Sequence, residues 1–203
     1  MTFWSAPFFV YTKTMAMDRL LNLDAGISVA INSAHTPFLD AIMVFVSKIW
    51  VWVPLYLFVL AYIILLNRKN WKTILLYVAG LALTLLLTDQ ISCFVKDSVC
   101  RFRPCHDPSL EGIVRVIVSK GSKYGFFSSH AANVFGFAFL SSRILKKNWY
   151  TIFIFIWAAI ISYSRIYLAK HFFGDVICGT LFGVAIAAIV NVILQRIVLQ
   201  LKS

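Results

Sequence analysis

The chain has 203 residues, of which 61% are hydrophobic and 13% are charged, and its mean hydropathy is +0.83. Soluble domains carry about 45–50% apolar and about 25% charged residues, so this composition excludes an ordinary water-soluble domain. The formal net charge of +11 does not indicate nucleic acid binding, because the basic residues stand at the ends of long apolar runs. Anionic lipid headgroups or phosphate substrates are the expected partners there.

The N-terminal segment, residues 1–36, holds only short apolar pieces. Residues 3–11 contain Pro7 and lack a basic start, so we predict no cleavable signal peptide. Residues 18–33 are amphipathic, and we predict a helix that lies in the membrane interface or is partly re-entrant. Pro37 then breaks the chain.

Longer apolar runs follow, and each predicts a membrane-spanning helix. These runs are 42–66, with a kink expected at Pro54, then 71–95, 126–145, 149–163 and 176–201. The polar loop 97–125 is far longer than a usual connection and is expected to cover an extracytoplasmic site. We therefore predict an all-α polytopic membrane bundle of five to six spans that forms a single domain over residues 1–203.

Because successive spans cross the bilayer in opposite directions, a set of polar residues is brought to one face of the membrane. Its members are Lys96, Arg103, Ser128, Ser129, His130, Arg165, His171 and Asp175. The opposite face carries Arg68, Lys69, Lys72, Arg143, Lys146, Lys147, Arg196 and Lys202. The positive-inside rule makes that second face cytoplasmic, so the polar set is expected to face outward.

Two histidines in this set can divide the labour of phosphoryl transfer. His171 and Asp175 are four residues apart, so on a helix they share a face and the carboxylate can hold the imidazole. A histidine supported in this way suits a nucleophile, and His130 is the candidate acid for the leaving oxygen. No carboxylate cluster is available to hold two metal ions, so we expect neither a metal nor another cofactor.

The other members of the set predict an anion site. Lys96, Arg103 and Arg165 are cations. Ser128 and Ser129 bring hydroxyls and backbone N–H groups to a helix start. Cations around a helix N-terminus most naturally hold a tetrahedral phosphate. Singly, these residues could be snorkelling anchors, a plain helix pair or a helix cap; their joint spacing and common face favour the functional interpretation.

Several polar or small residues are given structural roles. We interpret Asp89 as structural and His106 as a loop residue rather than a third catalytic histidine. Gly179 and Gly183 indicate close helix packing. The cysteines show no metal-ligand spacing, and a pairing of Cys100 with Cys105 in an oxidising compartment stays open.

Three ordered motifs resemble those of the type-2 phosphatidic acid phosphatase superfamily. They are Lys96 followed after six residues by Arg103-Pro104, then Ser128-Ser129-His130, then Ser164-Arg165 with His171 and Asp175. The resemblance implies a phosphohistidine at His171, held by Asp175, with His130 as acid and the cations around the phosphate. One departure is visible: Phe127 and Ser129 replace the family's usual Pro and Gly, so the Ser129 side chain could crowd the phosphate or add a hydrogen bond.

The resemblance further implies metal-independent dephosphorylation of a lipid phosphate or diphosphate at the outer face of a bacterial inner membrane. Undecaprenyl diphosphate is the first expectation; phosphatidylglycerol phosphate, lipid A phosphate and a lipid phosphotransferase reaction are alternatives. A transporter is a remoter alternative, because transport sites lie near the bilayer midplane and here only Asp89 sits deep. The expected partners are the bilayer and the lipid substrate, with no nucleic acid and no obligate protein partner.

Overall fold

The computed structural model describes residues 15–201, so the apolar piece at 3–11 lies outside the described part. Within it the chain is helical and has no strand. The long helices are α1 (Met15–Ser33), α2 (Pro37–Val46), α3 (Val53–Asn67), α4 (Trp71–Val99), α5 (Ser129–Leu145), α6 (Asn148–Tyr167) and α7 (Phe173–Gln200). Short 3₁₀ helices are η1 (Ile49–Trp52), η2 (Pro104–His106) and η3 (Pro108–Leu110). The predicted all-α class is confirmed.

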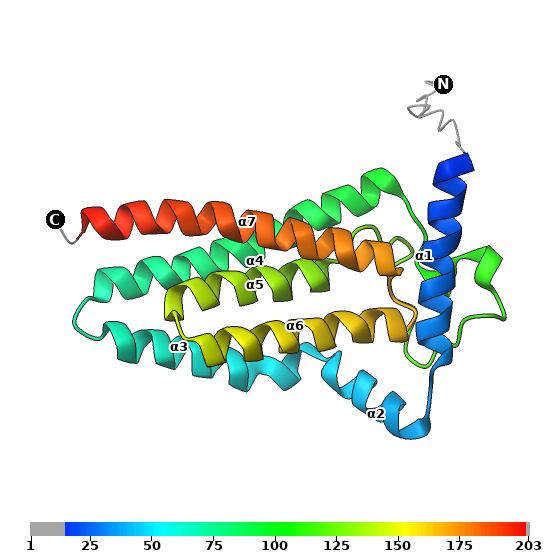
Figure 1. Ribbon diagram of the computed structural model, residues 1–203, viewed down its shortest axis with the longest axis horizontal. Helices are drawn as coiled ribbons and strands as arrows, with labels where there is room; N and C mark the ends of the chain where they lie inside the picture. Colours follow the sequence, from blue (N-terminus) through cyan, green and yellow to red (C-terminus); the bar gives the residue numbers. More distant parts are fainter. Residues whose placement is uncertain (1–14, 202–203) are drawn as a thin grey trace, which may run out of the picture.

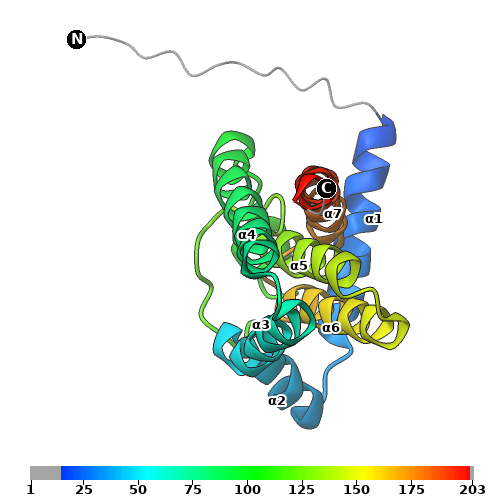
Figure 2. The same ribbon diagram turned by 90° about the vertical axis from the view of Figure 1, so that its left-hand side faces the viewer.

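Helices α3 to α7 run side by side along the long axis of the molecule, and α1 lies across one end of them (Figure 1). Seen end-on, α5 occupies the middle, with α4, α6 and α7 around it (Figure 2). Most side chains of α5 are buried, whereas the outer helices expose large apolar ones. Examples that are more than half exposed are Leu57, Leu65, Leu75, Leu86, Leu181 and Ile189. Such an apolar outer surface suits lipid rather than water.

Four segments of the described chain are long and apolar enough to cross a membrane, and the bent pair α1–α2 would make five. The chain direction bends by 113° between the two helices of this pair. Six spans, the upper end of our prediction, are not reached within residues 15–201. Helix α5 falls outside the count because its 17 residues are about 26 Å long, shorter than the roughly 30 Å hydrocarbon core.

The first predicted span was wrong in one respect, because it is not a single kinked helix from residue 42. The chain breaks after Val46 and resumes as a span at Ile49. Pro54 stands in the first turn of α3, where its missing N–H costs nothing. The indole of Trp52 donates a hydrogen bond to the Val46 carbonyl (2.8 Å) and satisfies one acceptor at the end of α2.

Two glycines of α7 set the distance between α7 and the central helix α5. A Cβ atom on Gly179 would lie 2.4 Å from the Ser128 carbonyl oxygen, and one on Gly183 would lie 2.1 Å from that of Ala132. Both are impossible contacts, so only glycine allows these backbones to touch. The predicted close packing is confirmed, and it brings the start of α5 against the start of α7.

The long connection between α4 and α5 is fixed to the α1–α2 elbow. Asn32 of α1 donates to the carbonyl oxygens of Arg115 (2.9 Å) and Tyr167 (2.7 Å). Asp40 of α2 accepts a hydrogen bond from the Tyr167 hydroxyl (2.6 Å) and a paired contact from the Arg115 guanidinium. The elbow therefore ties the connection to the end of α6, two residues beyond Arg165.

Candidate functional site

The helix ends next to α1 surround a cavity of about 370 Å³. Lys96 near the end of α4, Arg103 of the connection, Ser129 and His130 at the start of α5, and His171 after α6 all line it. Five of the eight predicted site residues thus share one cavity wall. The remaining three, Ser128, Arg165 and Asp175, are buried and are not part of its lining.

His171 and Asp175 lie close together, as predicted, but not on one helix face, because His171 precedes α7 and Asp175 stands in its first turn. His171 Nδ1 lies 3.7 Å from Asp175 Oδ2, and the two side chains are 2% and 0% exposed. Asp175 Oδ2 also accepts the backbone N–H of Phe172 (3.0 Å) at the start of α7. With Nδ1 turned toward the carboxylate, Nε2 is the ring nitrogen that remains for another partner.

Burial and neighbouring cations control the charge of His171. Desolvation, followed by the positive charges of Arg165, Arg103 and Lys96, holds the pKa of His171 well below the ordinary 6.5. A lowered pKa means that the imidazole is neutral at pH 7, with its lone pair available. A neutral imidazole with a free lone pair is the form that a histidine nucleophile requires.

Arg101 is a site residue that sequence reasoning missed. Its guanidinium donates to Asp175 Oδ1 (2.7 Å) and to Asp24 Oδ2 (2.6 Å), and it stacks on the Phe172 ring, 4.2 Å from the centroid. Arg101 therefore occupies the second oxygen of Asp175 and orients that carboxylate. The sequence signal that could have identified Arg101 is its position between Lys96 and Arg103, inside the first motif.

The N-terminal helix reaches this arrangement through Asp24, which was also missed. Asp24 Oδ1 accepts the Gly174 N–H (2.6 Å), and the Ser28 hydroxyl accepts the Phe173 N–H (2.9 Å). Both bonds satisfy free N–H groups in the first turn of α7. No local pattern around Asp24 marks it, since its partners lie 77 and 150 residues away.

The two arginines of the predicted anion site differ in how they are held. Arg103 Nε donates to the Tyr124 carbonyl (3.1 Å), which fixes the guanidinium at the cavity. Arg165 is 8% exposed, and its Nε has no hydrogen-bond partner among the described residues. A buried guanidinium with an unused donor suits an anionic ligand. Lys170, by contrast, contacts the Ser119 carbonyl oxygen and is occupied there.

The two serines at the start of α5 have separate roles. Ser128 is fully buried and caps the helix by accepting the Ala131 N–H (3.4 Å), while its own N–H donates to the Asp175 carbonyl (3.0 Å). Ser129, which stands at the departure from the family pattern, accepts hydrogen bonds from Ser92 (2.6 Å) and from the Lys96 ammonium. Its hydroxyl therefore orients Lys96.

The cavity is also lined by side chains outside the predicted set. They are Ile49, Tyr56, Leu85, Asp89, Asn133 and Val134. Most are apolar, as expected of a wall that meets a lipid chain. Asp89, interpreted from the sequence as structural, and Asn133 are the polar members of this group, and both line the cavity.

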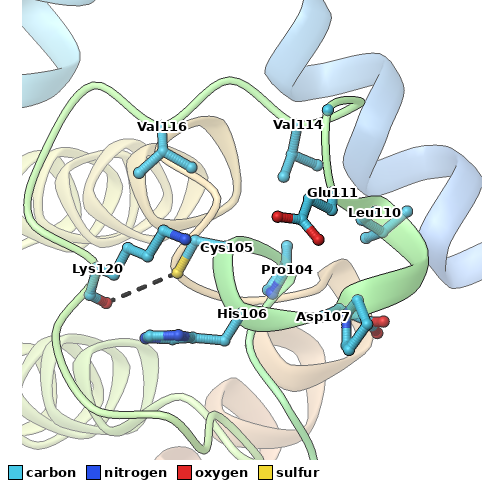
Figure 3. Close-up of a pocket in the computed structure, with 11 residues that line it drawn as sticks. Pro104, Cys105, His106, Asp107, Leu110, Glu111, Val114, Val116 and Lys120 are labelled. Atoms are coloured by element: carbon cyan, nitrogen blue, oxygen red, sulfur yellow. Dashed lines mark hydrogen bonds between the residues drawn. The ribbon is translucent and has the colours of Figure 1, made fainter.

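A second, smaller pocket of about 200 Å³ lies within the connection itself (Figure 3). His106 lines it and pairs with the Gly121 carbonyl (3.2 Å), so this histidine belongs to the loop as predicted. The carboxylates of Asp107 and Glu111 also line this pocket and would repel a phosphate. Cys100 and Cys105 are both free thiols, so that disulfide is not formed.

No group of three or more His, Cys, Asp or Glu side chains within residues 15–201 is placed to hold a metal ion. The cavity instead offers fixed cations, hydroxyls and two imidazoles. These groups can bind a phosphate, attack it and protonate a leaving oxygen.

Comparison with known proteins agrees with this chemistry. Residues 73–198 match the profile of the PAP2 superfamily, the type-2 phosphatidic acid phosphatases. The lipid A 4'-phosphatase of Bacteroides thetaiotaomicron is 37% identical, with 82% of this chain and 75% of that protein covered. The lipid A 4'-phosphatase of Porphyromonas gingivalis is 33% identical, with 92% of this chain and 78% of that protein covered.

The same fold occurs in a solved structure. It is a transmembrane PAP2-type phosphatidylglycerolphosphate phosphatase from Bacillus subtilis, with a TM-score of 0.71 and 22% identity. The match covers 89% of this chain and 88% of that one. The likeness therefore extends over nearly the whole bundle.

Proposed function

Because the chain belongs to the PAP2 superfamily and is a multi-pass lipid phosphatase of bacterial type, we propose that it removes phosphate from a lipid phosphate monoester through a phosphohistidine, without a metal ion. The observation that carries the proposal is the shared cavity wall of Lys96, Arg103, His130 and His171. The unpartnered donor of the buried Arg165 supports it.

In the first step His171 Nε2 attacks phosphorus, and a P–N bond forms while the bond from phosphorus to the lipid oxygen breaks. His130 gives its proton to that oxygen, so the lipid leaves as an alcohol. In the second step water attacks phosphorus, His130 takes a proton from the water, and the P–N bond breaks. Asp175 supports the imidazolium in both steps, while Lys96, Arg103 and Arg165 balance the charge on the phosphoryl oxygens.

For the substrate we propose a lipid A-type phosphate. The two curated relatives at 33% identity or more are both lipid A 4'-phosphatases, and each match spans most of both chains. This moves the proposal away from undecaprenyl diphosphate, the first expectation from the sequence. The two lipids differ in chemistry, since one carries its phosphate on a sugar and the other carries a diphosphate on a prenyl chain.

The proposal is tested by phosphate release from a lipid panel. Purified protein in detergent with EDTA should hydrolyse lipid A with a higher kcat/KM than phosphatidylglycerol phosphate or undecaprenyl diphosphate. Turnover that stops in EDTA and returns with magnesium would contradict the metal-free mechanism. A preference for undecaprenyl diphosphate would contradict the substrate assignment.

We also propose that the cavity opens on the outer face of the inner membrane. The turns that carry Arg68, Lys69, Lys72, Lys146 and Lys147 lie at the end of the bundle opposite the cavity (Figure 1). By the positive-inside rule that end is cytoplasmic. The same orientation places the α4–α5 connection outside.

Cysteine labelling checks the orientation. Ser122 is exposed in the α4–α5 connection, so Ser122→Cys in a background without the native cysteines should react with an impermeant thiol reagent in spheroplasts. A cysteine at Asn70, in the turn between α3 and α4, serves as the inside control. Labelling of the Ser122 position only after lysis would reverse the topology.

A further inference from the structure

Two polar residues lie in the deeper part of the cavity, below the groups that would hold phosphate. Asp89 precedes Lys96 by seven residues on α4, two turns along the same helix face and about 10 Å deeper. Asn133 follows His130 by three residues on α5, one turn deeper on its face. Both side chains line the cavity. A carboxylate and an amide therefore line the cavity on the deeper side of the groups that would hold phosphate.

These two side chains keep hydrogen-bonding capacity for a ligand. The Thr88 hydroxyl donates to Asn133 Oδ1 (2.5 Å), which orients the amide and leaves Nδ2 without a partner among residues 15–201. The Asp89 carboxylate forms no hydrogen bond and no close ion pair with a described residue, although its charge acts on Lys96 over a longer distance. The cavity thus presents one donor group and one acceptor group at a depth where unpaired polar groups are costly.

A prenyl diphosphate fits this depth poorly. With its terminal phosphoryl group at His171, its second phosphate would lie closer to the Asp89 carboxylate, and like charges repel. Its hydrocarbon chain would leave Asp89 and Asn133 without partners. A phosphorylated sugar instead places hydroxyl and amide groups beside the phosphate, which can donate to Asp89 and accept from Asn133.

We infer that Asp89 and Asn133 form a binding subsite for the sugar that carries the scissile phosphate, and that they select phosphorylated glycolipids over lipids without a sugar. This inference rests on the proposed lipid phosphatase activity and adds the residues that recognise the headgroup. A site built to hydrogen-bond a substrate discriminates strongly against an analogue that lacks those groups.

The test compares two lipids that carry phosphate monoesters, lipid A and dioleoyl phosphatidic acid, in the same detergent micelles. The variants are Asp89→Asn, which keeps the side-chain size, and Asn133→Leu, which removes the amide. The neighbouring Gln90 is exposed and outside the cavity lining, so Gln90→Leu is the matched control. We expect each cavity variant to lower the kcat/KM ratio of lipid A to phosphatidic acid by about ten- to a hundredfold. The control should leave the ratio unchanged.

The outcomes separate the subsite from the proposed function. An unchanged ratio in Asp89→Asn, with monodisperse elution of the protein, overturns the subsite even if wild type prefers lipid A. Wild type that cleaves prenyl diphosphate in preference to lipid A overturns both the subsite and the substrate proposal. Absence of wild-type turnover on every phosphorylated lipid overturns the phosphatase assignment itself. If Asn133→Leu aggregates, the kcat/KM ratio of Asp89→Asn alone decides whether the subsite exists.

Discussion

His171→Ala should abolish turnover, with a loss on the order of 10⁴-fold or more, as expected when a covalent nucleophile is removed. His171, the proposed nucleophile, lines the cavity, and its Nδ1 lies 3.7 Å from Asp175 Oδ2. Without an imidazole no phosphoenzyme can form. The measurement is phosphate release from lipid A, together with trapping of an acid-labile phosphoprotein in wild type after rapid quench.

The structure changes how this variant must be controlled. From the sequence, His171 is a site residue whose loss spares the core, yet its side chain is only 2% exposed, so alanine also removes packing. His171→Gln keeps most of the volume and should be as inactive as alanine. His106→Ala removes a histidine outside the cavity and should retain activity. A His171→Gln variant with near wild-type turnover would show that this residue is not the nucleophile.

His130→Ala should separate monophosphate from diphosphate substrates. A monophosphate expels an alkoxide, which needs a proton in the transition state, whereas a diphosphate expels a phosphate ester that already tolerates negative charge. General acid catalysis contributes about 10²–10⁴-fold, so kcat/KM for lipid A should fall by about that factor. The loss on undecaprenyl diphosphate should be distinctly smaller.

The ratio of mutant to wild-type kcat/KM on the two lipids is the quantity to measure. The value of kcat/KM depends only on the steps up to release of the lipid. It therefore excludes the later attack of water, in which His130 would act as the base for both substrates. Chemistry must be shown to limit that rate. Equal losses would mean that His130 mainly binds phosphate and is not the acid. Gln90→Leu, at an exposed residue outside the cavity lining, is the comparison variant that should leave this ratio unchanged.

The phosphate end of the site follows from the sequence because its residues lie in short motifs at helix ends. The spacing of four residues predicts the pairing of His171 with Asp175, although His171 lies before α7 and only Asp175 stands in its first turn. The alternation of apolar runs brings Lys96, His130 and Arg165 to one end of the bundle. Apolar length and composition likewise determine the all-helical membrane class. Residue spacing and the lengths of apolar runs are local properties of the chain, so a single sequence is enough to determine them.

The tertiary structure decided what depends on contacts between distant segments. Asp24 reaches the start of α7 across 150 residues, and Arg101 reaches Asp175 across 74. No local pattern encodes such contacts. The glycine contacts of α7 with α5 determine how near the two histidine-bearing ends approach. The break after Val46 could not be predicted from the sequence. The run 42–66 is uniformly apolar, and hydropathy does not indicate where a helix ends. The sequence shows Asp89 as a charged residue inside an apolar run. Only the packing of α4 against α5 places it with Asn133 on the cavity wall, because side-chain burial depends on which segments lie next to each other.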